Sequence, residues 1–170
     1  MDFHLDSLLN LPNVTVLSCQ QQEGFVFLSL DFLNEGILCP HCQTYTDNLH
    51  QTRPILVRDL SIVGQGVYLK VPRRQFICPH CGRYPTEPPT HLELNSRWKA
   101  GVHSAPLEWI ETRRNYTKRY EEYIYEKVKE LTVEQVSKTE QLSPEQVQSI
   151  FSRQARKKKR LVNARKAEPR

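Results

Sequence analysis

Two identical tetrapeptides contain the residues of this chain whose types and spacing could do chemistry. Cys39-Pro40-His41-Cys42 and Cys78-Pro79-His80-Cys81 stand on either side of residues 43–77. Thiolates at this spacing on two tight turns can surround one tetrahedral Zn²⁺ at about 2.3 Å per bond. Four thiolates leave no coordination position for a substrate. The sequence therefore predicts one structural Zn²⁺, bound by Cys39, Cys42, Cys78 and Cys81.

An enzymatic dithiol and a disulfide are the alternative roles for these cysteines. Cys-Pro-His-Cys is also the active-site sequence of some thiol oxidants, in which the first thiol is acidic at a helix N-terminus. Here the tetrapeptide occurs twice, with no secretory signal and no βαβ pattern around it, which favours zinc. We expect His41 and His80 to be exposed rather than ligands. Cys19 has no partner at this spacing and is expected to be a buried apolar residue.

Short strands must position the cysteines. Aromatic and β-branched residues predict strands over residues 24–33, 54–60 and 67–72. Gly64-Gln65-Gly66 suits a hairpin connection between the last two strands, which would bring the two cysteine pairs together in a small antiparallel unit. The proline-rich residues 84–89 cannot continue a strand ladder, so the unit is expected to end there.

Residues from Thr117 onward have the periodicity of helices. Apolar residues of the first helix fall on one face: Tyr120, Ile124, Val128 and Leu131. Thr132 and Ser143 each begin a capping box with a Gln three residues later, so two further helices start close together and form a helix-turn-helix with the first. Gln141 stands in the turn where Gly is usual, at a cost of about 1 kcal/mol. Glu140 stands where an apolar residue would pack.

The predicted fold class is therefore α+β, with a small antiparallel β zinc ribbon followed by a three-helix helix-turn-helix domain. We assign residues 1–88 to the β-rich zinc-ribbon domain and 89–115 to a linker with short ordered segments. Residues 116–160 are assigned to the helix-turn-helix domain and 161–170 to a disordered basic tail.

The basic residues are concentrated in the C-terminal part of the chain. Residues 1–52 contain six acidic residues and no Lys or Arg, whereas the rest of the chain holds all 24 basic residues against 13 acidic ones. Residues 153–170 alone have nine basic residues against Glu168. This polarity predicts a C-terminus that binds a polyanion, and a solvated tail is the alternative. The chain has no apolar stretch of about 18 residues and an acidic N-terminus, so we expect a cytoplasmic protein without membrane contact.

The second helix of the helix-turn-helix has residue types that can read base edges. With Val147, Ile150 and Phe151 turned inward, its polar residues lie outside. Gln and Arg can bind adenine and guanine in the major groove, and the basic run that follows can bind phosphates. An ordinary solvated helix is the alternative. The predicted DNA contacts are Gln146, Gln148, Ser149, Ser152, Arg153, Arg156, Lys157 and Lys158.

These motifs together resemble one known family, the ISL-three insertion-sequence transposases. The similar segments run from Val57-Arg58-Asp59-Leu60 through Arg73-Arg74-Gln75-Phe76-Ile77-Cys78 to Thr86-Glu87, with Cys39–Cys42 upstream and 132–151 downstream. The resemblance covers about residues 8–160 and implies that these modules recognise the inverted repeats at transposon ends. In the family, an RNase H-like domain with a DDE carboxylate triad catalyses transposition. No residues match it here, and Glu121, Glu122 and Glu126 are expected on a solvated helix face.

We therefore expect a non-catalytic protein that binds double-stranded DNA sequence-specifically, as the N-terminal half of a truncated transposase. Its expected partners are the inverted repeats, together with a second copy in a homodimer or a separate catalytic transposase chain. A zinc-dependent helix-turn-helix transcriptional regulator would share these parts and differ in its target. An RNA-binding zinc-ribbon protein would prefer single strands or hairpins to duplex.

Overall fold

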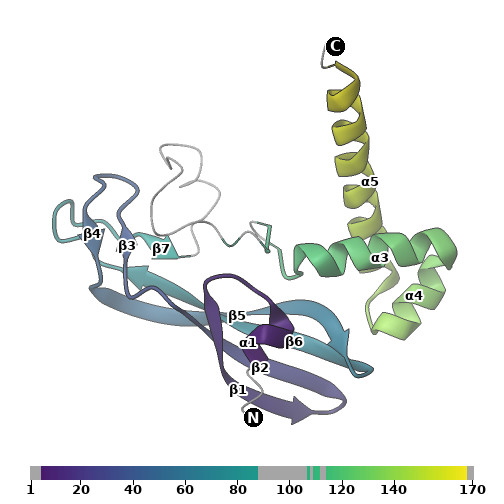
Figure 1. Cartoon of the computed structure of the whole chain (residues 1–170), viewed down its shortest axis with the longest axis horizontal. Coiled ribbons are helices and arrows are strands. Elements are labelled where there is room, and N and C mark those ends of the chain that lie inside the picture. Colours follow the sequence, from purple (N-terminus) through teal and green to yellow (C-terminus); the bar gives the residue numbers. More distant parts are fainter. Residues whose placement is uncertain (1–4, 88–106, 108, 112–113, 168–170) are drawn as a thin grey trace. The chain divides into compact units, whose positions relative to one another are not determined.

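The computed structural model describes residues 5–87, 107, 109–111 and 114–167 (Figure 1). The chain divides into two compact units, Met1–Thr117 and Lys118–Arg170. The first unit contains the strands and the second consists of helices, which confirms the predicted α+β class. In the described part of the chain, no helix has the length and hydropathy of a membrane-spanning segment.

A five-stranded sheet forms the body of the first unit. Its strands follow the order β1-β2-β6-β5, and β7 pairs with β6. The strands β3 and β4 form a separate two-stranded hairpin. Along the chain the elements are α1 (Leu5–Leu9), β1 (Val14–Gln22), β2 (Phe25–Phe32), β3 (Ile37–Leu38), β4 (Tyr45–Thr46), β5 (Leu49–Ile62), β6 (Gln65–Phe76) and β7 (Thr86–Glu87).

The sheet is mixed, so the prediction of a small antiparallel unit was wrong. The strands β2 and β6 run parallel, from Phe25 opposite Gly66 to Ser29 opposite Lys70, whereas the other pairs are antiparallel. Central positions suit the strands with the most buried apolar residues, and β2 and β6 are those strands. The second strand of the hairpin, β6, lies beside β2 and runs in the same direction. The first strand, β5, runs in the opposite direction and lies at the edge of the sheet.

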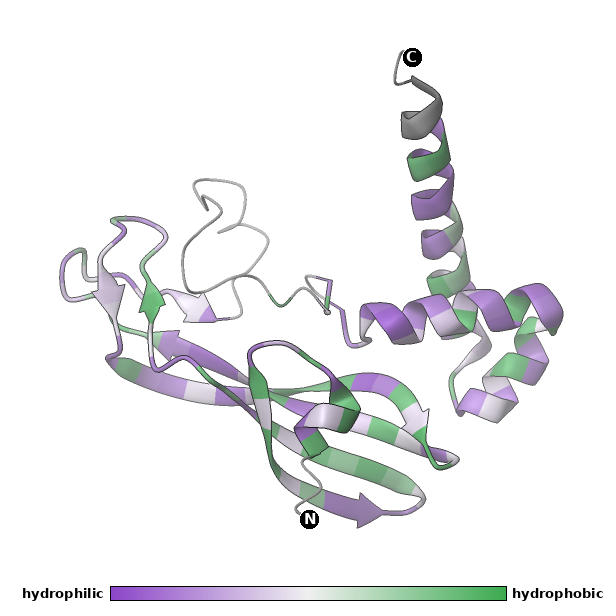
Figure 2. Ribbon diagram, in the orientation of Figure 1, coloured by the Kyte–Doolittle hydropathy of each residue, from purple (hydrophilic) through white to green (hydrophobic). Residues whose placement is uncertain are grey.

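The edge strand β1 was not predicted. It is hydrophilic towards its glutamine-rich end (Figure 2), and every residue from Leu17 to Gln22 is exposed. Cys19 lies in this stretch and is exposed, so the expectation of a buried cysteine was wrong. The strand is held by pairing with β2 along its length, which a hydrophobic pattern does not reveal.

Two-residue turns of one kind close both hairpins of the sheet. Glu23-Gly24 joins β1 to β2, and Val63-Gly64 joins β5 to β6. All four residues have positive φ, at 51°, 80°, 51° and 75°. This is the pattern of the type I′ turn, whose twist matches that of the strands and in which Gly avoids a Cβ clash. The predicted β5–β6 hairpin is therefore present, with its turn one residue earlier than Gly64-Gln65-Gly66.

Trp109 and the residues that follow it complete the first unit. Trp109 belongs to the hydrophobic core, which also contains Leu9, Val14, Leu28, Leu30, Phe32, Val57, Val67, Leu69 and Val71. The backbone of Arg58 on β5 accepts a hydrogen bond from Thr117 N–H at 2.9 Å and donates one to Asn115 at 2.8 Å. Thr117 Oγ1 also donates to the buried carboxylate of Asp59 at 2.7 Å. The described part of the segment expected as a linker is therefore attached to the sheet.

The second unit contains α3 (Lys118–Glu130), α4 (Val133–Glu140) and α5 (Pro144–Ala167). Both predicted capping boxes are present. Thr132 and Gln135 exchange hydrogen bonds of 3.0 and 3.3 Å, and Ser143 and Gln146 exchange bonds of 2.9 and 3.2 Å. Gln141 ends α4 in the left-handed conformation with φ 54°.

The helix α5 extends beyond the predicted end of the helical domain. It continues to Ala167, so the expected disordered tail from residue 161 was wrong over residues 161–167. Between Pro144 and Pro169 the sequence has no Gly or Pro that would end a helix. The repulsion between the closely spaced basic residues of α5 does not prevent the helix from forming there.

Buried carboxylates connect the helices of the second unit. Glu121 on α3 is 1% exposed and accepts hydrogen bonds from Arg153 Nη2 at 2.5 Å and Gln154 Nε2 at 2.8 Å, both on α5. It is therefore not on a solvated face, contrary to expectation. Glu140 on α4 is also buried and accepts from the hydroxyls of Tyr120 and Tyr123 at 3.1 and 3.0 Å. Two phenols thus satisfy a carboxylate at the position expected to be apolar.

Replacing Arg153 with Ala is expected to destabilise the second unit by about 3 kcal/mol, because it leaves the Glu121 carboxylate buried without its cationic partner. Urea denaturation followed by helical circular dichroism measures the change. Arg156→Ala, an exposed position on the same helix, is the matched control and should change the free energy of unfolding by less than about 0.5 kcal/mol. Equal, small effects of the two substitutions would contradict the role assigned to Arg153.

Candidate metal centre and nucleic-acid interface

The structure brings together the sulfur atoms of the four predicted cysteines. All four lie within 4.8 Å of one another. The Sγ–Sγ distance is 3.6 Å between Cys39 and Cys81 and 3.4 Å between Cys42 and Cys78. Sulfurs bound at about 2.3 Å to one tetrahedral ion would be about 3.8 Å apart. The cluster therefore has the donor set and the size of a structural Zn²⁺ site.

The two cysteine turns, called knuckles below (39–44 and 78–83), have the same backbone geometry. In each, the N–H of the residue after the second cysteine donates to the carbonyl of the first cysteine at 2.9 Å. These residues, Gln43 and Gly82, both have left-handed backbones, with φ 62° and 65°. At Gly82 this conformation has no steric cost, because Gly has no Cβ atom. In the first knuckle Gln43 adopts the same conformation at a cost of about 1 kcal/mol.

Hydrogen bonds hold the segment after the first knuckle against the residue before the second. Thr46 Oγ1 donates to the carbonyl of Ile77 at 2.7 Å, and Ile77 N–H donates to the carbonyl of Asn48 at 2.8 Å. Gly36 opens the β3–β4 hairpin, where a Cβ atom would lie 2.4 Å from the carbonyl oxygen of Thr46. A larger residue at position 36 would therefore push apart the strands that bring the first knuckle to the second.

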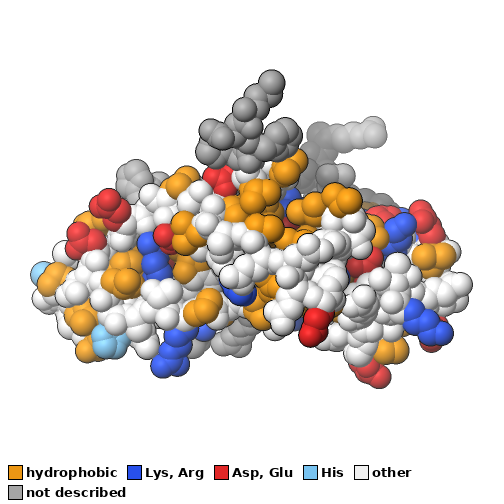
Figure 3. All heavy atoms as spheres, turned by 90° about the horizontal axis from the view of Figure 1, so that it is seen from below, with side chains coloured by type: hydrophobic (Ala, Val, Ile, Leu, Met, Phe, Trp, Pro, Cys, Tyr) orange, Lys and Arg blue, Asp and Glu red, His pale blue; other side chains and the backbone are white. Residues whose placement is uncertain are grey.

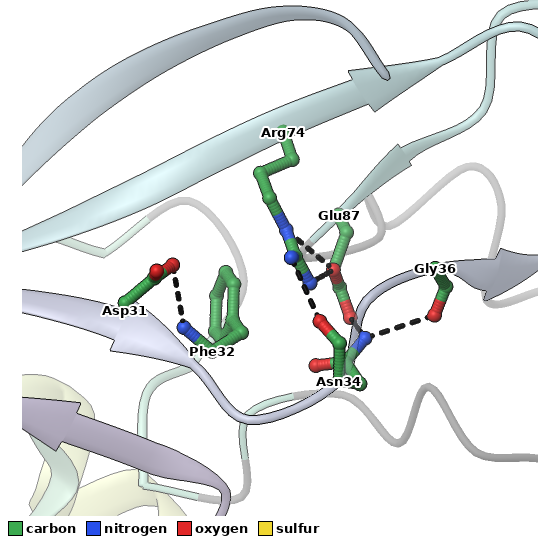
Figure 4. A network of polar contacts seen from close by, with 6 residues as sticks. All are labelled: Asp31, Phe32, Asn34, Gly36, Arg74 and Glu87. Atoms are coloured by element: carbon green, nitrogen blue, oxygen red, sulfur yellow. Dashed lines mark hydrogen bonds and ion pairs between the residues drawn. The ribbon is translucent and has the colours of Figure 1, made fainter. Parts of the chain in front are cut away.

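A buried ion pair fixes the chain next to the knuckles (Figure 4). Arg74 on β6 binds Glu87 on β7, with its Nη2 and Nε atoms 2.5 and 3.1 Å from Oε2. Arg74 Nη1 donates to the carbonyl of Asn34 at 2.8 Å, and Asn34 Nδ2 donates to Glu87 Oε1 at 3.0 Å. The guanidinium also lies over the rings of Phe32 and Phe76. The network joins the end of β2 to β6 and β7, on both sides of the cysteines in sequence.

The protein environment affects the cysteines of one knuckle in opposite ways. Burial raises the pKa of the Cys39 thiol to about 12. Hydrogen bonds from Thr44, first from its side chain, lower the pKa of Cys42 to about 5. Metal binding requires every cysteine ligand as thiolate, so a cation must displace the proton from Cys39. His41 and His80 are exposed, as predicted, and His41 Nδ1 lies 2.8 Å from Arg83 Nη1.

On the face drawn in Figure 3, Lys and Arg side chains lie in separate small groups. The basic residues of α5 are assigned from their own contacts. Among the eight predicted DNA contacts, Arg153 is bound to Glu121. Lys158 lies 2.6 Å from Glu126 and 3.6 Å from Glu122, with its Nζ over the Tyr125 ring. Both cations thus serve the packing of α5 on α3.

The remaining predicted contacts are exposed, except for Ser152, which is half-buried. Four of them, Gln148, Ser149, Ser152 and Arg156, line one shallow groove together with Val133, Glu134, Pro144 and Glu145. Gln146 is exposed, and its side-chain oxygen accepts the N-cap hydrogen bond from Ser143. Lys157 is exposed on the next turn. The groove includes Glu134 and Glu145, which were not predicted as site residues, because their place beside the polar helix face depends on the packing of α4 against α5.

Cys78→Ser is expected to abolish stoichiometric zinc binding, because it removes a ligand from a closed four-thiolate site. Native mass spectrometry of the purified chain should find one zinc ion in the unmodified protein and none retained by the variant. Cys19→Ser changes the exposed cysteine outside the cluster and should keep one zinc ion. Loss of zinc in both variants, or in neither, would contradict the site.

Zinc affinity is expected to fall as the pH is lowered through the neutral range. The raised pKa of Cys39, about 12, means that its proton leaves when the metal binds, so a lower pH favours the metal-free form. Competition with a chromophoric chelator at a series of pH values measures this dependence. An affinity independent of pH between about 6 and 9 would be inconsistent with thiolate ligation at Cys39.

Comparison with known proteins agrees with this geometry. Residues 35–85, which contain both knuckles, match the family model described as the zinc-finger of transposase IS204/IS1001/IS1096/IS1165. Residues 105–155 match the helix-turn-helix domain of transposase family ISL3, the ISL-three family. No curated protein and no solved structure matched the chain. The four cysteines therefore bind one structural Zn²⁺. The chain therefore resembles the ISL3 transposases in these two segments, which match the family's zinc ribbon and its helix-turn-helix, in that order, and both are DNA-binding domains.

Proposed function

We propose that this protein recognises the inverted repeats at transposon ends, with α3, α4 and α5 forming a three-helix helix-turn-helix and α5 reading base sequence in the major groove. The DNA-binding class of both matched domains supports DNA as the ligand. The turn between α4 and α5 is short and internally bonded, since Leu142 N–H donates to the Ser137 carbonyl at 3.0 Å and Ser137 Oγ donates to the Leu142 carbonyl at 2.8 Å. This bonding fixes the direction in which α5 leaves the turn.

The groove at the start of α5 is the observation that carries the proposal. Recognition helices contact base edges mainly with their N-terminal residues. Gln148, Ser149 and Ser152 lie in the first three turns of α5, at the spacing of neighbours on one helix face. Gln can bind adenine bidentately, and Ser can bind any base. The groove thus offers base-reading side chains where a recognition helix needs them.

The acidic residues of the groove favour sequence discrimination over non-specific binding. Glu145 is exposed, and a hydrogen bond from Ser143 lowers the pKa of its carboxyl, so the group is ionised at neutral pH. A carboxylate accepts from the amino group of cytosine and repels phosphates. Glu145 would therefore strengthen the binding of a duplex that places a cytosine next to it. It would weaken the binding of a duplex that places a phosphate there.

Phosphate contacts are assigned to the cations of α5 that do not hold Glu121 or Glu126. Arg156 lines the groove one turn beyond Ser152, and Lys157, Lys159 and Arg160 are exposed. Each phosphate that such residues neutralise should steepen the dependence of log K on log[salt] by about 0.9. Arg153 and Lys158, which the sequence favoured, are left out of the proposed interface because their charges are paired inside the second unit.

Gln148→Ala is expected to reduce the preference for the inverted repeat by about 1–3 kcal/mol, because a bidentate base contact is lost. Its affinity for a scrambled duplex should stay unchanged. Fluorescence anisotropy with the zinc-loaded chain compares two duplexes, one carrying the inverted repeat beside the gene and one with its sequence scrambled. Gln21→Ala, the same change at an exposed position of β1, is the matched control and should keep the preference.

The proposal fails if the unmodified chain binds both duplexes equally. Selection from a random duplex library tests the target independently. Enrichment of a sequence found in a promoter and absent from the inverted repeats would favour the transcriptional regulator instead.

A further inference from the structure

The four arginines of β5 and β6 divide into a buried and an exposed pair. Arg58 is 4% exposed, with its guanidinium stacked over two aromatic rings at 5.0 and 4.9 Å. Arg74 is 9% exposed and bound to a buried carboxylate. Arg53 and Arg73 are both exposed. Neither has an acidic or hydrogen-bonding partner for its side chain among the described residues.

Arg53 and Arg73 face each other directly across the β5–β6 ladder. Side chains at such positions have Cβ atoms about 4.5–5.5 Å apart, and like charges there destabilise the sheet. The fold therefore gains nothing from this pairing. An anion held between the two guanidinium groups would turn the repulsion into attraction.

A groove surrounds the two arginines. It is lined by Gln51, Arg53, Ile55, Arg73, Gln75 and Thr86, none of which is acidic. By strand alternation this face of β6 also carries Leu69 and Val71, which are covered by the hydrophobic core further along the strand. The sheet face is therefore closed at one end and open, polar and cationic at the other.

We propose that this groove binds the phosphate backbone of duplex DNA, with Arg53 and Arg73 as the phosphate contacts. The planar guanidinium fork matches phosphate oxygens bidentately. Gln and Thr side chains, which flank the arginines here, also contact phosphate and sugar in protein–DNA complexes. A duplex offers closely spaced phosphates to both arginines. The proposal rests on duplex DNA being the ligand, as in the proposed function, and is independent of the base sequence that α5 reads.

Arg53→Gln and Arg73→Gln test the proposal in the zinc-loaded full chain. Affinities for the inverted-repeat duplex and the scrambled duplex are measured over a range of salt concentrations. Each substitution should lower the slope of log K against log[salt] by about 0.9 for both duplexes, and the ratio of the two affinities should not change. Thermal unfolding should stay the same or shift upward, because a like-charge pair has been removed.

Lys70→Gln is the matched control. It removes one positive charge from β6 on the opposite face, where Lys70 lies over the Phe27 ring, and should leave the slope unchanged. The proposal is overturned if the arginine variants keep the original slope, or if Lys70→Gln lowers it equally. An unchanged slope with intact preference for the inverted repeat would overturn only this site. A lowered slope in a chain without that preference would support this site and contradict the proposed function of α5.

Discussion

Zinc–thiolate bonding is the interaction on which the first unit depends at the end remote from its hydrophobic core. The core residues lie on α1, β1, β2, β5 and β6 and around Trp109, whereas the two knuckles are brought together by hydrogen bonds of the adjacent residues Thr46, Asn48 and Ile77 and by the four sulfurs. Four thiols within 4.8 Å bring together groups that cannot all be thiolates without a cation between them. Zn²⁺ supplies that charge. It thereby fixes the chain on both sides of the long β5–β6 hairpin.

Charge pairing inside each unit decides which basic residues can meet a ligand. Arg74 and Arg153 hold buried carboxylates, Lys158 sits between Glu126 and the Tyr125 ring, and Arg58 packs on aromatic rings. These four residues add to the positive net charge of the chain. Their own charges, however, are paired with carboxylates or packed on aromatic rings, so they are not assigned to ligand binding. Among the described residues, exposed cations without such a role include Arg156 and Lys159 on α5 and Arg53 and Arg73 on the open end of the sheet. Net charge alone would have attributed DNA binding to the C-terminal run.

Local patterns were predictable from the sequence, and long-range pairing was not. The knuckles, the two capping boxes and the β5–β6 hairpin each depend on residues within a few positions of one another. Burial of Glu121 depends on Arg153 and Gln154, more than thirty residues later. The parallel β2–β6 pairing and the edge strand β1 depend likewise on which strands meet in the sheet. The groove around Arg53 and Arg73 lies far from the turn of the β5–β6 hairpin, so it depends on the register that the two strands keep along their length.

X-ray absorption at the zinc edge of the purified full chain measures the zinc–thiolate bonding directly. The four-cysteine site requires a ligand set of four sulfur atoms at about 2.3 Å. A ligand set containing nitrogen or oxygen, or a folded chain without zinc, would contradict it.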